Sequence, residues 1–401
     1  MFRSKKIIYI YLFILLLVCL FKINNISSYF LESRKLQNMA EDSHSIKRRA
    51  IMINQPIQWS FPIRYYVDEY LLTEYVDDAL KIISDETCIT FAKSYYKINA
   101  GQGINFIQSE YCGSHVGPQQ NLEPQSVYLS QNCCLKIVNI QHETAHALGL
   151  THEQCRSDRD NFITIKKENM MEGLETNYEK DPNEWFTSYS NQYDFGSGMH
   201  YFSNSFSSNG KNVIDSKIPE YNKMMGQRSY LSFNDYKLLN YRYCNDTCKD
   251  SQVVCKNSGY LNPNKCNECK CPNGYIGTTC EYIEISDRDC DNAELIATNQ
   301  IDSLFKVGYK NCTFRIKSLS GNKIIIYVKE INTNEEKPCL ENNGLEIKYR
   351  KDKGAMGLCL CGYYNRSFML TSENDEVLVM YRGKTMFNYF QIMYHESQIT
   401  F

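Results

Sequence analysis

The sequence lacks an excess of charge of either sign. Lysine and arginine together number 44 against 46 aspartates and glutamates, so the formal net charge is -2 at pH 7. Proteins that bind nucleic acid or other polyanions usually carry a clear surplus of basic residues. The composition therefore gives no indication of a nucleic-acid partner, whereas its 43% of hydrophobic residues is ample for a folded core.

Long apolar runs are also scarce, and the single one lies at the N-terminus. Arg3, Lys5 and Lys6 precede the apolar stretch Ile7–Phe21. This order is typical of a secretory signal peptide, and the stretch is shorter than the roughly 20 residues that span a bilayer. No small-residue cleavage site is evident, so an uncleaved signal anchor is the alternative. We expect residues 1–21 to direct export and the rest to be extracellular, without further membrane contact.

Cysteine, in contrast, is abundant. The chain has 18 cysteines, of which Cys19 lies inside the apolar run, so an odd number remains. Such a density in an exported chain predicts a disulfide framework rather than a set of reactive thiols. Three Asn-X-Ser/Thr motifs, at Asn245, Asn311 and Asn365, are candidate glycosylation sites.

A polar segment, residues 22–49, follows the apolar run and ends in three basic residues, Lys47, Arg48 and Arg49. A solvated linker is the simpler interpretation. Because the basic residues directly precede a sequence of globular character, we favour a propeptide that is cleaved between Arg49 and Ala50.

Residues 50–244 have the pattern of an α+β domain. Ile63–Val67 and Cys88–Phe91 are rich in β-formers, and apolar residues recur at helical spacing from Leu72 to Ile83. We therefore expect strand, helix and strand in this order at the start of the domain.

Residues 245–283 are crowded with cysteines and poor in aliphatic residues. Such a segment buries too little apolar surface to fold without covalent links. Its cysteine spacing resembles an EGF-like module. The resemblance implies the pairs Cys248–Cys266, Cys255–Cys269 and Cys271–Cys280.

Residues 288–401 contain fewer cysteines and several short β-type runs, such as Lys323–Val328 and Glu376–Tyr381. Regularly spaced strands of this kind predict a β-sandwich. Because it follows an EGF-like module in the chain, the segment resembles a CUB domain. The resemblance implies Cys290–Cys312 and a bond from Cys339 to Cys359 or Cys361, of which we choose Cys339–Cys359. The remaining cysteine is then a free thiol or is bonded to another chain.

Histidines are few, yet three of the seven lie between His142 and His152. His142 and His146 are one helical turn apart, so both imidazoles project from one face of a helix and can share a metal. Glu143 lies beside them, where its carboxylate reaches a metal-bound water rather than the metal.

Gly149 allows a third histidine to join this pair. A continuing helix would carry His152 away from the face that His142 and His146 share. Glycine tolerates positive φ and lets the chain turn there. Three nitrogen ligands with an open fourth position are typical of a catalytic zinc site. A bare HExxH can arise by chance, but the added glycine and third histidine match the metzincin pattern.

Further motifs extend this match across residues 50–244, and together they resemble the astacin family of zinc metalloendopeptidases. The order of the three domains also resembles multidomain astacins, including nematode ones. The matching segments are His142–Asp160, Tyr193–Tyr201, Thr87–Phe91, Cys112–Gly117, Gly226–Arg228 and Leu231–Phe233.

The resemblance implies one zinc ion held by the three histidines, with Glu143 as general base. It also implies that Met199 forms an apolar floor beneath the metal and that Tyr201 is a displaceable ligand that stabilises the transition state. The amino group freed at Ala50 would lie near Glu153. An edge strand at Cys112–Gly117 would bind the extended substrate.

The family's disulfides correspond to Cys88–Cys244 and Cys112–Cys134, and we expect the remaining two cysteines to pair as Cys133–Cys155. Three features depart from the family pattern. The propeptide has no FxGD motif, Leu150 replaces the commoner phenylalanine, and Gly198 replaces a larger apolar residue, which predicts a looser turn. For His44, His115, His200 and His395 we expect packing or surface roles.

We therefore predict a secreted zinc metalloendopeptidase, made as a zymogen, that cleaves extracellular proteins and docks substrate or matrix through its EGF-like and CUB modules. An adhesive protein with an inert protease domain is one alternative, which the intact Glu143 disfavours. A zincin with a glutamate as third ligand is another, which His152 and Met199 disfavour.

Overall fold

The computed structural model describes residues 51–53, 57–119, 123–181 and 186–397. The predicted signal segment, the propeptide and the cleavage position between Arg49 and Ala50 lie outside these residues. Within the described part of the chain, no helix is long and apolar enough to cross a membrane.

The first lobe is built on a five-stranded sheet in the order β3-β2-β4-β6-β5. All neighbours are parallel except β5, which pairs antiparallel with β6 at one edge. The strands are β2 (Ile63–Val67), β3 (Phe91–Lys93), β4 (Ile104–Gln108), β5 (Gly113–Ser114) and β6 (Gln125–Leu129). The strand expected at Cys88–Phe91 begins only at Phe91, and Cys88 before it is bonded to Cys244.

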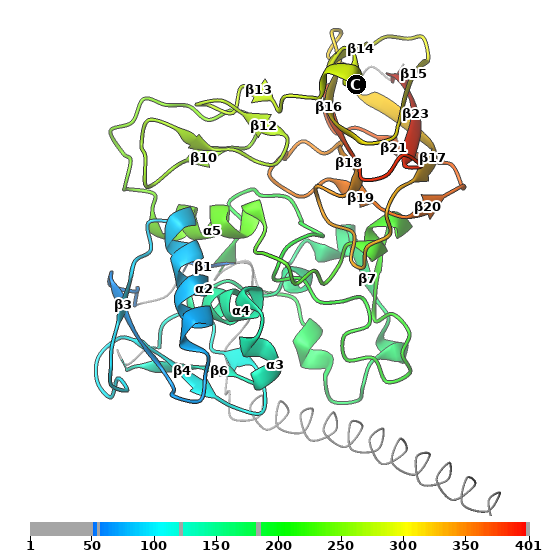
Figure 1. Cartoon of the computed structure of the whole chain (residues 1–401). Helices are drawn as coiled ribbons and strands as arrows, with labels where there is room; N and C mark the ends of the chain where they lie inside the picture. The colour runs from blue at the N-terminus through cyan, green and yellow to red at the C-terminus, as the bar shows by residue number, and fades with distance from the viewer. Residues whose placement is uncertain (1–50, 54–56, 120–122, 182–185, 398–401) are drawn as a thin grey trace, which may run out of the picture. The chain divides into compact units, whose positions relative to one another are not determined.

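Helices cover this lobe (Figure 1). Helix α2 (Thr73–Glu86) buries Val76, Ala79, Leu80 and Ile83, which share one face at helical spacing. Helix α4 (Ile137–Ala147) packs against α2, β5 and β6, and α5 (Phe233–Tyr243) closes the domain. The short α3 (Gln131–Cys134) precedes α4.

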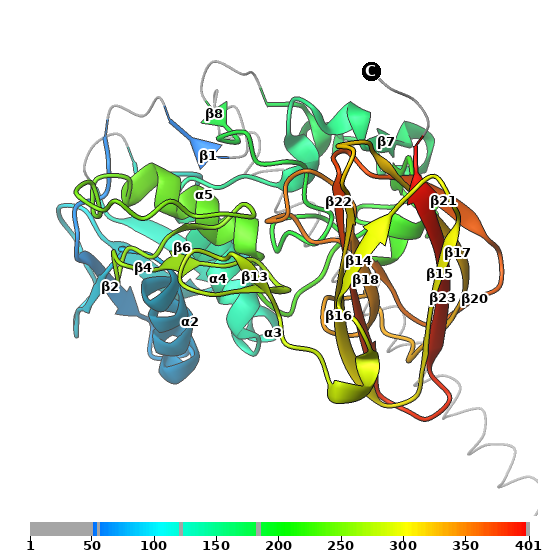
Figure 2. The same cartoon turned by 90° about the horizontal axis from the view of Figure 1, so that it is seen from above.

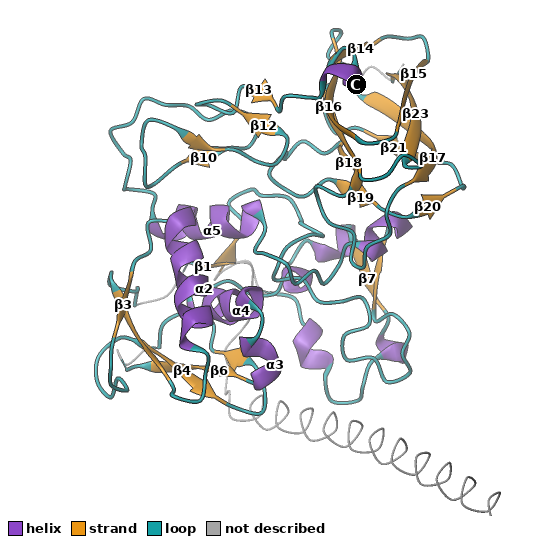
Figure 3. Cartoon of the chain, viewed as in Figure 1, coloured by secondary structure: helices purple, strands orange, loops and turns teal. Residues whose placement is uncertain are grey.

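The second lobe, between α4 and α5, consists mainly of loops (Figure 3). Its short elements are the 3-10 helices η1 (Glu153–Cys155), η2 (Arg159–Asn161), η3 (Lys167–Asn169), η4 (Glu175–Tyr178) and η5 (Pro219–Lys223), with strands β7 (Ile163–Ile165) and β9 (Ile214–Ser216) paired antiparallel. Strand β1 (Ile51–Met52) pairs with β8 (Phe186–Thr187), so the first described residues lie within the fold. The α+β prediction for this part of the chain is confirmed.

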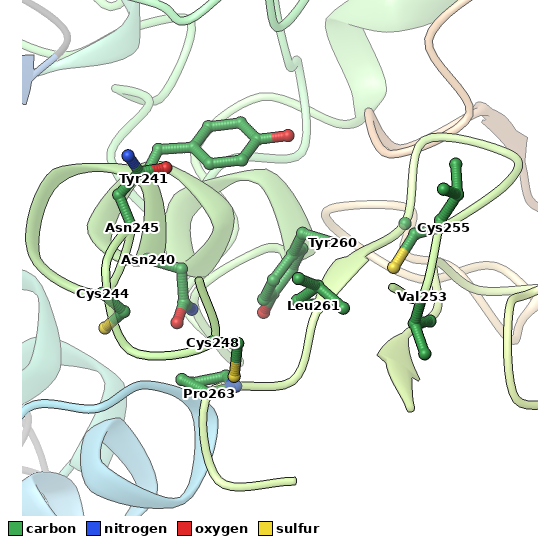
Figure 4. Close-up of a pocket in the computed structure, with 12 residues that line it drawn as sticks. Asn240, Tyr241, Cys244, Asn245, Cys248, Val253, Cys255, Tyr260, Leu261 and Pro263 are labelled. Atoms are coloured by element: carbon green, nitrogen blue, oxygen red, sulfur yellow. The ribbon is translucent and has the colours of Figure 1, made fainter. Parts of the chain in front are cut away.

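The cysteine-rich segment contains the two antiparallel pairs β10 (Tyr260–Leu261) with β11 (Cys269–Lys270) and β12 (Tyr275–Ile276) with β13 (Tyr282–Ile283). Its three disulfides are the predicted ones, Cys248–Cys266, Cys255–Cys269 and Cys271–Cys280. Lys270 forms an ion pair with Glu86 at the end of α2. Between this segment and α5 lies a pocket of about 330 Å³, with Asn240 and Tyr260 on its walls (Figure 4).

The last segment is the predicted β-sandwich, and Figure 2 shows its two sheets face to face. One sheet has the order β14-β16-β22-β18-β19, and the other has β15-β23-β17 with β20 and β21 both paired to β17. The elements are η6 (Arg288–Cys290), β14 (Glu294–Ala297), β15 (Asp302–Val307), β16 (Lys310–Ser318), β17 (Ile324–Asn332), β18 (Gly344–Lys348), β19 (Leu358–Leu360), β20 (Tyr363–Tyr364), β21 (Phe368–Thr371), β22 (Glu376–Gly383) and β23 (Tyr389–Glu396). The structure also contains the predicted Cys290–Cys312 bond.

Two predicted disulfides of the first domain are wrong. The structure pairs Cys112 with Cys133, so neither Cys112–Cys134 nor Cys133–Cys155 is present. Cys133 and Cys134 are neighbours on the single turn of α3, and their side chains therefore point in different directions. Cys134 is buried in the hydrophobic core, and Cys155 is buried with its thiol donating to the Asn177 carbonyl.

The choice of Cys359 in the sandwich is also wrong. Cys339 bonds to Cys361, which follows the last residue of β19 directly. Cys359 lies within that strand and is fully buried, with its backbone N–H donating to the sulfur of Met224. Cys359 is therefore the odd cysteine of this segment, and its thiol is free.

The loop between β18 and β19, residues 349–357, contacts the second lobe. Asp352 accepts hydrogen bonds from the Gln192 N–H at 3.0 Å and from the Asn234 side chain at 3.1 Å. Arg350 donates to the Tyr193 carbonyl at 2.6 Å. One hydrophobic cluster includes buried residues of both the second lobe and the sandwich. The loop is thus packed onto the segment that leads to Met199.

Candidate metal centre

Helix α4 carries the first half of the site. It is buried almost throughout, and His142, Glu143 and His146 are all buried on it. The helix ends at Ala147, and Gly149 follows with φ of +99°. A methyl group added at Gly149 would approach other atoms no closer than 3.7 Å, so this position needs glycine for its backbone conformation rather than for space.

The turn at Gly149 brings His152 back toward the two histidines of the helix. The ring centroids of His146 and His152 are 4.6 Å apart, and those of His142 and His152 are 5.3 Å apart. One ligand atom from each of the three histidines lies within 4.8 Å of the others. The sequence-predicted ligand set is therefore brought together in one place.

Main-chain carbonyls orient two of these rings. The Nδ1 atom of His142 lies 2.9 Å from the Gly198 carbonyl, and that of His146 lies 2.7 Å from the Leu150 carbonyl. A carbonyl oxygen only accepts hydrogen bonds, so each Nδ1 carries the proton and each Nε2 keeps its lone pair.

The Nε2 atoms of His146 and His152 are 3.3 Å apart. Burial lowers the pKa of His142 well below its usual value, and the nearby His146 and Arg228 act in the same direction. Three convergent imidazoles, two of them oriented by carbonyls, are the donor set that a catalytic Zn²⁺ ion takes. The residues present therefore fit the ion that the sequence predicts.

Glu143 lies beside these ligands, and its carboxylate is not one of the metal-binding atoms that cluster there. Burial raises its pKa to about 8, against the opposing effect of the Arg228 guanidinium. A carboxylate with this proton affinity is suited to accept a proton near neutral pH and release it again.

Met199 is buried in the same hydrophobic cluster as Ala145 and Ala147 of α4, in a turn that three hydrogen bonds hold. Its N–H donates to the Ser197 hydroxyl at 2.9 Å, its carbonyl accepts from the Glu153 N–H at 3.1 Å, and the Gly198 N–H donates to Asp235 at 2.8 Å. A methyl group on Gly198 would lie 2.8 Å from the Leu231 side chain. The turn is therefore tightly packed at Gly198, and the expectation that glycine loosens it is wrong.

Tyr201 lies next to His152, with 4.3 Å between the ring centroids. Its backbone N–H donates to the Gln154 side chain at 3.0 Å. The preceding His200 is fully buried, between the Tyr193 hydroxyl at 2.6 Å and the Tyr201 carbonyl at 2.8 Å. His200 thus has the structural role expected from the sequence.

Glu153 is buried next to the site and forms an ion pair with Arg156 at 3.1 Å. Its carboxylate also accepts from the Asp194 N–H at 2.8 Å. Burial raises its pKa to about 8, while Arg156 lowers it. The N–H of Met52 donates to the Gly149 carbonyl at 3.0 Å, so the start of the described chain runs beside the turn that positions His152.

Three residues near the site have no role that could be predicted from the sequence. Arg228 is half-buried, donates to the His200 carbonyl at 3.0 Å and contributes to the electrostatic environment of Glu143. Tyr178 and Phe206 pack on Tyr201. Arg228 belongs to a matched motif, Gly226–Arg228, but Tyr178 ends the short helix η4 and Phe206 lies in a loop, and neither belongs to a periodic pattern. His115 is exposed, and His395 stacks on Tyr327 in the sandwich.

Comparison with known proteins places these observations in a family. Residues 52–244 match the family model described as Astacin, a family of peptidases. The chain is 33% identical to zinc metalloproteinase nas-34 of Caenorhabditis elegans, over 86% of this chain and 56% of that protein. It is 30% identical to zinc metalloproteinase dpy-31 of Brugia malayi, over 82% of this chain and 56% of that protein.

The chain thus spans little more than half the length of these two relatives. Among solved structures, it is similar to high choriolytic enzyme 1, a hatching enzyme zinc-protease of Oryzias latipes. That match has 27% identity and a TM-score of 0.42, and it covers 47% of this chain and 96% of the other.

Proposed function

Since residues 52–244 of this chain belong to the astacin family, we propose that the protein is a secreted zinc metalloendopeptidase that hydrolyses peptide bonds in extracellular proteins. The observation that carries the proposal is the convergence of His142, His146 and His152 beside the buried Glu143. Three convergent nitrogen donors next to a buried carboxylate suit metal-assisted hydrolysis.

In this proposal the three histidines hold one zinc ion, which when bound polarises the scissile carbonyl and lowers the pKa of a water to roughly 7. Glu143 takes the proton of the attacking water and passes it to the leaving amine. The Tyr201 hydroxyl donates to the oxygen on which negative charge develops. Met199 closes the site from below.

The substrate is proposed to lie along β5, the edge strand Gly113–Ser114. Strand β5 pairs with β6 on one side and ends the order of the sheet. An extended peptide can bind such an edge through backbone hydrogen bonds, which give affinity without fixing sequence. The Gly117 N–H donates to the His146 carbonyl at 2.8 Å, which ties this region to the candidate metal centre.

We further propose the processing and domain order expected from the sequence: a signal segment at 1–21, a propeptide at 22–49 removed by cleavage after Arg49, a protease domain at 50–244, an EGF-like module at 245–283 and a CUB domain at 288–401. Cleavage would place the amino group of Ala50 near Glu153. The cysteine pattern and the sandwich support the two module names. Exposure of Asn245, Asn311 and Asn365 supports glycosylation.

The two modules are proposed to dock protein substrates or matrix, a role that keeps the protease near its targets. The competing hypothesis is that the modules alone act, in binding, and that the protease domain is inert. The presence of Glu143 beside three convergent histidines favours catalysis, because an inert domain has no need for a proton acceptor in this place.

The test compares the secreted, processed chain with Glu143→Gln on a mixture of peptide substrates, with zinc content measured on both. We expect about one zinc per chain in each, and a loss of about 10²- to 10⁴-fold in kcat for the variant. If the parent chain binds zinc, begins at Ala50 and still cleaves none of the peptides, the proposal is wrong and the binding hypothesis replaces it.

A further inference from the structure

Tyr201 is enclosed by aromatic rings on more than one side. Its ring centroid lies 4.3 Å from that of His152, 5.7 Å from that of Tyr178 and 5.6 Å from that of Phe206. The Tyr178 ring is edge-on to Tyr201, with an interplanar angle of 84°, and Phe206 is inclined at 64°. Edge-to-face contacts at these distances are attractive and directional.

Tyr178 is firmly fixed. It is buried at the end of η4, within the hydrophobic cluster of the second lobe. Its hydroxyl donates to the Ser205 carbonyl at 2.6 Å. Tyr178 therefore packs on Tyr201 and also ties down the loop that carries Phe206.

Phe206 is held in an unusual conformation. Its φ is +53°, a left-handed value that costs a bulky residue free energy. Its carbonyl accepts from the Met171 N–H at 2.9 Å, and Ser207 forms a β-bridge with Met170. The fold thus maintains a strained backbone at the residue whose ring completes the enclosure of Tyr201, which is more than simple core packing requires.

We propose that Tyr178 and Phe206 are positioning residues, which pack on the ring of Tyr201 beside His152 and so limit the directions in which its hydroxyl can move when it is displaced and donates. This proposal rests on the proposed function, because it assigns these residues to the step in which Tyr201 takes part. Tyr178 and Phe206 themselves do not touch the substrate. A tyrosine that its neighbours restrain loses less side-chain entropy when it donates in the transition state. Removal of this restraint therefore affects kcat rather than KM.

The first experiment is kinetic and uses Phe206→Ala in the full chain. We expect kcat to fall about tenfold, from the loss of an aromatic contact, with KM and zinc content unchanged. Phe91→Ala is the matched control, because Phe91 is also half-buried and edge-on to a tyrosine, Tyr65, at 6.4 Å, but on β3 of the first lobe. It should lose stability and keep kcat.

A double-mutant cycle separates positioning from general packing. In a chain that already carries Tyr201→Phe, adding Phe206→Ala should change kcat much less than it does in the parent, because no hydroxyl remains to be positioned. Tyr178→Phe keeps the ring and should retain more activity than Tyr178→Leu. An equal fall of kcat in the parent and in the Tyr201→Phe background would overturn the proposal.

The second experiment needs neither zinc nor activity. 3-Fluorotyrosine is placed at position 201 alone, and the ¹⁹F spectrum of the metal-free chain is recorded. We expect a broad or split signal from a restrained ring in the parent and in Phe91→Ala, and a single narrow signal in Phe206→Ala. The same line shape in all three would contradict the positioning role, even if the chain is an active peptidase. Conversely, an inactive parent with the expected spectra would contradict the proposed function alone.

Discussion

At the scale of single residues, the candidate metal centre depends on main-chain atoms as much as on side chains. The carbonyls of Gly198 and Leu150 accept from the Nδ1 atoms of His142 and His146 and so leave the Nε2 atoms to bind metal. Substitution cannot remove a carbonyl, but it can move one. The residues that set the backbone path at these two carbonyls therefore control metal affinity without being ligands.

The first prediction concerns Gly198→Ala. The added methyl group would lie 2.8 Å from Leu231 and 3.0 Å from the Tyr230 carbonyl, so the Gly198 backbone must shift. We expect zinc affinity to fall by about 10- to 100-fold, as for other changes to groups that orient ligands. Competition with a chelator measures it. Gly113→Ala is the control, since its methyl group would meet nothing closer than 3.6 Å.

The second prediction tests the corrected disulfide. Cys133→Ala breaks the bond to Cys112, which closes a loop with a sequence separation of 21, and should cost about 3 kcal/mol of stability. Cys134→Ala removes only a buried thiol and should cost about 1 kcal/mol. Denaturant unfolding gives both values. If Cys112 were bonded to Cys134 instead, Cys134→Ala would have the larger cost in stability and Cys133→Ala the smaller one.

At the scale of elements, the N-terminus of α5 braces the turn that carries Met199. Ser232 and Asp235 form a capping box, in which each side chain accepts from the backbone N–H of the other. The Asp235 carboxylate also accepts from the Ser197 hydroxyl at 2.6 Å and the Gly198 N–H at 2.8 Å. One helix end thus stabilises itself and the turn that carries Met199.

The third prediction is that Ser232→Ala costs about 1 kcal/mol of stability, the usual value of a lost cap, and also weakens zinc binding. Ser130→Ala is the matched variant, because Ser130 accepts from the Cys133 N–H as the cap of α3. It should lower stability but leave zinc affinity unchanged. If the two variants affect zinc affinity equally, the brace through Asp235 has no influence on the site.

The elements that the sequence predicted best are those with local causes. The three histidines of the candidate metal centre lie within one helix and the turn after it, so helical spacing and one glycine were enough to place them. Cys133 and Cys134 are adjacent, so spacing could not separate them, and only the direction of their side chains on α3 decides which one bonds. Tyr178 and Phe206 meet Tyr201 from separate loops. Contacts of that kind depend on tertiary packing, which no periodicity reports.

At the scale of the whole molecule, the sandwich packs against the second lobe, and buried residues of both form one hydrophobic cluster. Asp352 links the loop between β18 and β19 to Gln192 and Asn234. Burial alone would raise the pKa of Asp352, but nearby Lys237 and the N–H donors around it hold the pKa below its ordinary value. Its ionised form is thus favoured by folding.

The fourth prediction follows from this lowered pKa. A carboxyl whose pKa is lower in the folded state than in the unfolded state stabilises the fold at any pH above its unfolded-state pKa, about 3.9. This stability is lost as the pH falls through the lower folded-state pKa. Asp352→Asn should therefore cost about 1 to 3 kcal/mol near pH 7, with a difference from the parent that shrinks in acid. Unfolding curves over this range measure it. Asp302→Asn, at an exposed position on β15, should show no such difference.

The Cys88–Cys244 bond affects how proteolytic cleavage of this protein can be detected. It joins residues that are 156 apart in sequence, one shortly after α2 and the other directly after α5. A single cut in any surface loop between them leaves two polypeptides that one covalent link still holds together. The nicked chain would run as one band on a gel without reductant and as two fragments with it. Cleavage of this kind is not detected unless the sample is reduced. The segment with the three histidines stays covalently attached to the rest of the protein after the cut.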